Sequence, residues 1–168
     1  FVEVGNIDYL AGMEGNQFDF VWVFEGWDTI RYNEVAGKQT SSIKFADYLK
    51  CIPDWYTPIL ATSDDVTADR ADDLRAFLAA TRRGYQAAMA DPAAAADAVL
   101  EVAPDLDRDL VERSATFLAD RYAEDPAAWG VQDAAVWDGF TAFLVEAGLV
   151  EDGFDASTAW TGDYLDAD

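Results

Sequence analysis

A run of apolar and aromatic residues from Phe18 to Trp27 constrains the fold more than any other segment of the chain. Every residue from Phe20 to Phe24 is apolar, which is typical of a strand buried on both faces of a parallel sheet. The run ends at one carboxylate, Glu25, between aromatic rings. Ligands of open α/β sheets bind beyond such strand ends, so we predict a ligand site here. In the alternative interpretation, the rings are core and Glu25 is a solvated residue in a first helical turn.

The composition indicates a globular protein with a strongly acidic surface. The chain has 168 residues, 51% of them hydrophobic, with 33 acidic against 11 basic residues and a net charge of −22. This charge repels phosphate, so nucleic acid is excluded as a partner. We interpret the acidity as a halophilic surface, because in about 1 M salt the Debye length of roughly 3 Å screens self-repulsion. An acidic protein of ordinary salinity is the alternative.

The scarcity of cysteine and histidine excludes several kinds of site. Cys51 is the one cysteine and the chain has no histidine, so an intramolecular disulfide, a Cys-rich metal site and a Ser-His-Asp triad are excluded within it. We therefore expect no metal, no cofactor and no catalytic residue. The first residues, Phe1–Val4, already have the pattern of a strand, and we expect further chain to precede them.

The residue pattern changes near Thr62. Before it, apolar runs alternate with helical segments, which favours an α/β fold with a short parallel or mixed sheet. The predicted helices are 7–13 and 27–35, and the predicted strands are 1–4, 18–24, 41–48 and 59–62.

After Thr62 the pattern is helical. Ser63 begins a helical region that ends at Asp91-Pro92, and Pro92 is then the first residue of a helix capped by Asp91. Two more helices are predicted. One follows Asp105 to Arg108 and runs to about Tyr122, and the other spans about 133–147 with Gly148 as the stop.

Several motifs, in order along the chain, resemble one protein family. They are Val4-Gly5-Asn6 with Asn16-Gln17-Phe18-Asp19, Phe24-Glu25-Gly26-Trp27, the segment Pro53 to Ser63, Leu74 to Leu78 with Thr81 to Tyr85, Asp91-Pro92 to Ala103-Pro104, and Trp129 to Asp133. The family is that of the substrate-binding proteins of ABC importers related to nitrate, sulfonate and taurine binders, especially their thiamine-pyrimidine branch. Asp28 departs mildly, since that branch often has Glu there.

The resemblance implies a periplasmic-binding-protein type II-like fold with two lobes that close on a small molecule. Residues 1–52 would be part of lobe two, 53–62 the interlobe crossover and 63–168 the helical part of lobe one. The chain would be the C-terminal half to two-thirds of a complete member. Such a protein would be a monomer outside the cell, associated with the cell surface through an upstream lipid anchor, and its partner would be the importer's permease.

The resemblance also indicates how the ligand would be held. Glu25 would accept the hydrogen bond of an aminopyrimidine's exocyclic amine, and such charge-assisted bonds are strong. The rings of Phe24, Trp27 and Tyr56 would hold the flat heterocycle. Asn6 would either face the cleft or cap the helix that follows it. Four further aromatic residues resemble helix-packing core, namely Trp129, Trp137, Phe140 and Phe143.

The function implied is capture of a thiamine pyrimidine precursor, or a related organic solute, without a chemical reaction. A first alternative is a single-turnover pyrimidine synthase that consumes pyridoxal phosphate and one of its own histidines. Binders of sulfonate, taurine or nitrate, and a solute sensor without a transporter, also remain open.

Overall fold

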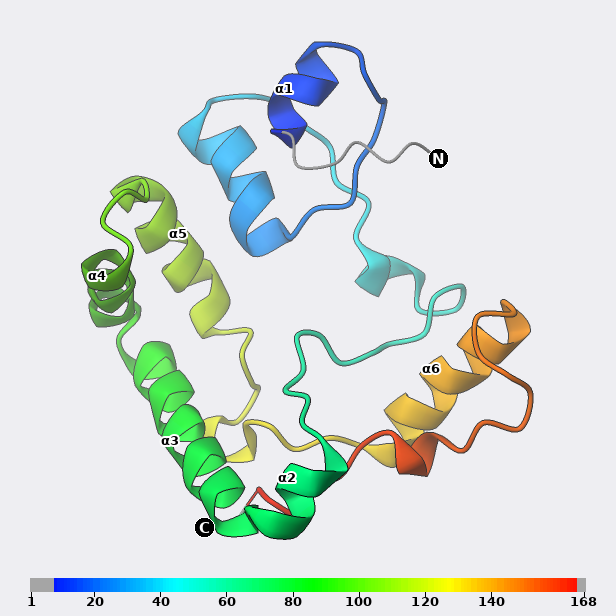
Figure 1. The fold of residues 1–168 in the computed structure, drawn as a ribbon. Helices are drawn as coiled ribbons and strands as arrows, with labels where there is room; N and C mark the ends of the chain where they lie inside the picture. Colours follow the sequence, from blue (N-terminus) through cyan, green and yellow to red (C-terminus); the bar gives the residue numbers. More distant parts are fainter. Residues whose placement is uncertain (1–7, 166–168) are drawn as a thin grey trace. The chain divides into compact units, whose positions relative to one another are not determined.

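A computed structural model of the chain describes residues 8–165, which divide between two compact units (Figure 1). Within the described residues, the first unit is formed by 8–42 together with Asp91–Ala119, and the second by Ile43–Ala90 together with 120–165. Each unit therefore combines two segments that are far apart in the sequence. The predicted ligand residues Glu25 and Tyr56 belong to different units.

The first unit is helical. It contains α1 (Tyr9–Glu14), two π-helical turns η1 (Glu25–Thr29) and η2 (Arg31–Val35), and the helices α4 (Pro92–Val102) and α5 (Arg108–Ala119). Helix α5 packs against α4, and both π-helical turns also pack on α5. Its buried apolar side chains are Ile30, Tyr32, Ala96, Leu110, Val111 and Ala119.

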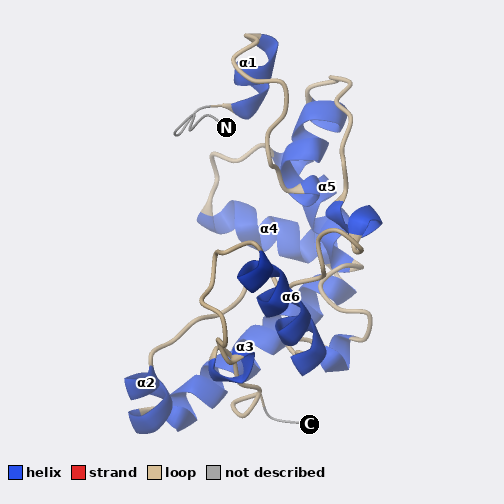
Figure 2. Ribbon diagram, turned by 90° about the vertical axis from the view of Figure 1, so that its right-hand side faces the viewer, coloured by secondary structure: helices blue, strands red, loops and turns tan. Residues whose placement is uncertain are grey.

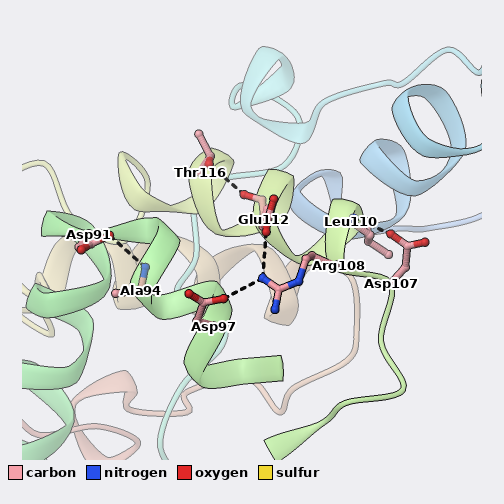
Figure 3. Close-up of polar contacts among 8 residues, drawn as sticks. All are labelled: Asp91, Ala94, Asp97, Asp107, Arg108, Leu110, Glu112 and Thr116. Carbon is pink, nitrogen blue, oxygen red and sulfur yellow. Dashed lines mark hydrogen bonds and ion pairs between the residues drawn. The ribbon is translucent and has the colours of Figure 1, made fainter. Parts of the chain in front are cut away.

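Side-chain caps and the ion pairs of Arg108 stabilise the α4–α5 pair (Figure 3). The Asp91 carboxylate accepts a hydrogen bond from the Ala94 N–H at 3.0 Å, and Asp107 caps α5 in the same way. Arg108, the first residue of α5, donates to Asp97 of α4 at 2.7 Å and to Glu112 of α5 at 3.0 Å. The caps satisfy N–H groups that have no partner inside the helix, and thereby fix where each helix begins.

The second unit contains two longer helices, one short helix and three 3-10 turns. These are η3 (Phe45–Tyr48), α2 (Asp64–Asp69), α3 (Ala71–Ala90), η4 (Pro126–Ala128), α6 (Ala134–Glu146) and η5 (Ala156–Thr158). On α3, Tyr85 stacks on Trp129 with ring centroids 4.7 Å apart and meets Tyr122 edge-on at 4.8 Å. These rings join α3 to the segment around η4, while α6 packs against η5.

The predicted α/β fold with a sheet is wrong for the part of the chain that the structure describes. Figure 2 shows helices and loops but no strand between residues 8 and 165. Residues 18–24 and 59–62 form no ladder, and residues 41–48 run into η3. A strand exists only where a second strand accepts its backbone hydrogen bonds, and these segments find none in the described residues. The predicted strand 1–4 lies outside those residues.

The helix predictions agree better with the structure. Helix α4 begins at Pro92 with Asp91 as its cap, and α6 is capped by Asp133. Gly148, which follows α6, has φ of 69°, the left-handed conformation that favours glycine at a helix end. Among residues 8–165 no helix combines the length and the apolar character that crossing a bilayer requires.

Candidate functional site

The first candidate element is the π-helical turn η1, which carries three of the predicted ligand residues. Phe24 is its N-cap, Glu25 its first residue and Trp27 its third. The Phe24 ring is 64% exposed, while Glu25 and Trp27 are half-buried. The Asp28 carboxylate accepts a hydrogen bond from the Phe24 N–H at 3.1 Å. This bond fixes the backbone where the extended segment enters the turn.

Gly26 brings this turn against helix α5. It is buried, and a Cβ atom placed on it would lie 2.9 Å from Leu118 Cδ2 and 3.1 Å from Phe117 Cδ1. A side chain at this position would force Leu118 and Phe117 of α5 to shift. The neighbouring Glu25 and Trp27 are thus placed by a close backbone contact inside the first unit.

Ion pairs brace the same unit. Arg31 of η2 pairs with Asp8, and this guanidinium is the main reason that the pKa of Asp8 lies below its usual value. Arg113 of α5 donates to Glu34 of η2 at 3.0 Å and to Asp109 at 2.9 Å. The turns that follow Glu25 are therefore tied to α5 by charge as well as by packing.

The second candidate element is an aromatic pocket around Tyr56 in the second unit. We call it the Tyr56 pocket, and its volume is about 150 Å³. Its lining combines the segment after η3 with one face of α6, and consists of Trp55, Tyr56, Ile59, Val136, Trp137 and Phe140. All six side chains are apolar or aromatic.

The rings of the Tyr56 pocket pack against one another in an ordered way. Trp55 stacks on Phe140 with centroids 5.5 Å apart and planes at 22°, and Tyr56 lies 6.2 Å from Trp137. Trp137 in turn stacks on Trp160 at 6.1 Å with planes 2° apart. Such offset arrangements are favourable beyond the area that they bury, so the aromatic faces are held in fixed orientations.

Two polar atoms of these rings are bonded within the unit. The Asp133 N–H donates to Tyr56 Oη at 2.7 Å, and Trp137 Nε1 donates to Gln132 Oε1 at 3.0 Å. Asp133 is also the N-cap of α6. The Tyr56 hydroxyl therefore connects the pocket's first segment to the start of the helix that supplies its other wall.

The structure places the predicted residues as follows. Phe24, Glu25 and Trp27 come together on η1, Tyr56 lines the Tyr56 pocket, and Asn6 lies outside the described residues. Their role in binding stays a prediction.

Sequence reasoning missed part of the pocket lining. We predicted Trp137 and Phe140 as core, but both line the pocket with Tyr56. Val136, Trp137 and Phe140 are spaced i, i+1 and i+4, which places them along one side of a helix, and this spacing was the available signal. Within residues 8–165, no group of three or more His, Cys, Asp or Glu side chains is arranged to hold a metal ion.

Comparison with known proteins covers the η1 turn and the first three lining residues of the Tyr56 pocket. The family model described as NMT1/THI5 like matches residues 1–95, a range that contains Glu25 and Tyr56. No curated protein matches the chain. The family consists mostly of binding proteins rather than enzymes, and it suggests an extracellular solute-binding role with a small-molecule ligand and an ABC transporter as partners. Since the match spans more than half of the sequence, this chain belongs to the NMT1/THI5-like family.

Proposed function

We propose that this chain is part of an extracellular protein that captures a thiamine pyrimidine precursor, or a related small organic solute, for an ABC importer. The observation that carries the proposal is the Tyr56 pocket, an aromatic pocket of which three lining residues, Trp55, Tyr56 and Ile59, lie inside the family match. Small-molecule sites are characteristically apolar and preformed, with few polar groups that fix orientation. In this proposal residues 1–52 contribute to lobe two, residues 53–62 cross over, and residues 63–168 complete lobe one.

Glu25 is the proposed polar contact. Its half-buried carboxylate follows the exposed ring of Phe24 and precedes Trp27. An aminopyrimidine presents an amine beside a ring nitrogen, and a carboxylate accepts the hydrogen bond of that amine. A hydrogen bond to a charged group contributes about 1.5–3 kcal/mol, so this contact supplies specificity as well as affinity.

The proposal is tested by thermal unfolding of the full chain in about 2 to 3 M KCl, conditions in which acidic self-repulsion is screened. The ligands are 4-amino-5-hydroxymethyl-2-methylpyrimidine, thiamine, taurine, an alkanesulfonate and pyridoxal phosphate. A ligand at about 100 times its Kd stabilises the folded protein by roughly 2.7 kcal/mol. We expect a clear rise in Tm with the aminopyrimidine alone. A rise only with pyridoxal phosphate would support the synthase, and a rise only with taurine or the sulfonate would support those binders.

A charge-neutral variant tests the role of Glu25. We expect Glu25→Gln to weaken aminopyrimidine binding about tenfold or more, because the charge-assisted bond is lost. Glu101→Gln is the matched control, since it removes the same charge from an exposed position on α4 of the same unit. Equal affinities of the two variants would remove Glu25 from the site.

A further inference from the structure

We infer that the Tyr56 pocket is a stacking site for one neutral, flat, six-membered ring, and that it rejects anionic groups. The inference deepens the proposed function and rests on it for its physiological role. The chemical claim rests on the size and lining of the pocket. It separates ring-containing solutes from the small oxyanions that related binders take.

The size of the pocket selects a single ring. An apolar cavity of 150 Å³ accommodates one benzene molecule, whereas sites for drug-sized ligands enclose about 300–1,000 Å³. The Tyr56 pocket, at about 150 Å³, therefore has room for one monocyclic ring. A two-ring solute would have to leave its second ring outside.

The lining offers aromatic faces for stacking. Trp55, Tyr56, Trp137 and Phe140 supply four of the six lining side chains. The stacked pairs Trp55–Phe140 and Trp137–Trp160 hold three of these rings in place. A ring that enters the pocket therefore meets surfaces that need no ordering when it binds, which lowers the entropic cost.

The lining has no positive charge with which to hold an anion. Among the lining's neutral donors, the Trp137 N–H is already donated to Gln132. The Tyr56 hydroxyl accepts from the Asp133 N–H and keeps its own O–H, and Trp55 contributes an indole N–H. The charged residues adjacent in sequence to the lining residues are carboxylates, Asp54 before Trp55 and Asp138 after Trp137. An oxyanion would lose its hydration without meeting a positive charge, and two neutral donors replace little of that hydration, whereas a neutral ring loses little.

Calorimetric titration of the full chain in about 2 to 3 M KCl at pH 8 tests the inference. The probes are 4-amino-5-hydroxymethyl-2-methylpyrimidine, benzyl alcohol and methanesulfonate. The pocket-filling variant is Ile59→Trp. The matched control is Leu60→Trp, which adds the same indole at the adjacent exposed residue that does not line the pocket. Trp137→Ala removes a stacking face instead, and circular dichroism checks that each variant keeps its helices.

We expect both ring probes to bind the wild type and methanesulfonate not to bind. Ile59→Trp should weaken ring binding more than tenfold and Leu60→Trp less than twofold. Trp137→Ala should weaken it roughly 5- to 150-fold, the range that loss of one stacking face gives in other proteins.

The outcomes separate this inference from the proposed function. Aminopyrimidine binding that is unchanged by Ile59→Trp and Trp137→Ala overturns the inference and leaves the proposed function standing. Benzyl alcohol binding that Ile59→Trp abolishes, with no aminopyrimidine binding, supports the inference and overturns the proposed function. Failure of both rings to bind, or methanesulfonate binding that Ile59→Trp abolishes, overturns the inference.

Discussion

Replacement of Gly26 by alanine tests whether the Glu25 turn is placed by its contact with α5. The new methyl carbon would lie 2.9 Å from Leu118 Cδ2, 3.2 Å from Leu118 Cγ and 3.1 Å from Phe117 Cδ1. These distances are shorter than ordinary carbon contacts, so the side chains of α5 must shift. Overpacking of this kind costs about 1–3 kcal/mol. Alanine recovers about 0.5–1 kcal/mol of backbone preference in a helical turn, which leaves a net loss between roughly 0 and 2.5 kcal/mol.

Gly84→Ala is the matched control. Gly84 lies in the interior of α3, and a Cβ atom built on it meets no other atom within 4 Å. We therefore expect this variant to gain about 0.5–1 kcal/mol from helix propensity alone. The same mutation would thus have opposite signs at two glycines of one chain.

The assay is reversible thermal unfolding in about 2 to 3 M KCl, with aminopyrimidine titration of each variant. For a chain of this size, 1 kcal/mol corresponds to roughly 2–4 °C in Tm, or 4–8 °C if the first unit unfolds alone. If Gly26→Ala raises Tm as much as Gly84→Ala does, the turn is not packed against α5 as described, and the argument that this contact places Glu25 is refuted.

Two further predictions concern ionisable side chains of the first unit. Tyr32 is 2% exposed and its buried hydroxyl has no protein partner, so Tyr32→Phe should stabilise the fold by about 1 kcal/mol in urea unfolding. Burial is the main cause of its raised pKa. The corresponding contribution to folding stability is fully present below about pH 10, the pKa of an unperturbed tyrosine, and is lost as pH rises through the folded pKa. If the stability of the variant declines at alkaline pH as steeply as that of the wild type, the assignment is contradicted. Asp8 has a lowered pKa because of Arg31 and the Ala11 N–H, so its contribution is present above the unfolded pKa of about 3.9 and is lost as pH falls through the folded value. Because the Asp8 side chain is 42% exposed, we expect Asp8→Asn to cost at most about 1 kcal/mol at pH 7. The variant should also lose stability less steeply than the wild type below pH 4. An equally steep decline would show that the Asp8–Arg31 pair contributes nothing.

The parts of the fold that local chemistry decides were predictable from the sequence. Asp91 and Pro92 give the start of α4 because a carboxylate accepts the first N–H groups and proline fits the first turn. Gly148 marks the end of α6 because its positive φ costs glycine little. These signals act over three or four residues and need no distant partner.

The predicted sheet failed because a strand depends on residues elsewhere in the chain. Phe20, Trp22 and Phe24 have the strand pattern, yet they are 79%, 66% and 64% exposed, and no described segment pairs with them. Their apolar character thus indicates a preference for burial without fixing a secondary structure.

The candidate site was predictable in part for the same reason. Glu25 and Tyr56 stand out as polar or amphipathic groups among aromatic residues. The contact between Tyr56 and Asp133 joins positions 77 residues apart, and no local pattern announces it. The wall that α6 supplies to the Tyr56 pocket therefore needed the structure.

The ion pairs on α5 show how a chain with few cations distributes them. Arg108 reaches Asp97 and Glu112, and Arg113 reaches Asp109 and Glu34, so each guanidinium serves two carboxylates at once. Arginine can do this because its planar fork presents several N–H donors in fixed directions, whereas the ammonium of lysine is a single compact charge. Eight of the 11 basic residues are arginine. With three carboxylates for every cation, a side chain that can pair along more than one edge lets each positive charge stabilise more than one carboxylate on the surface.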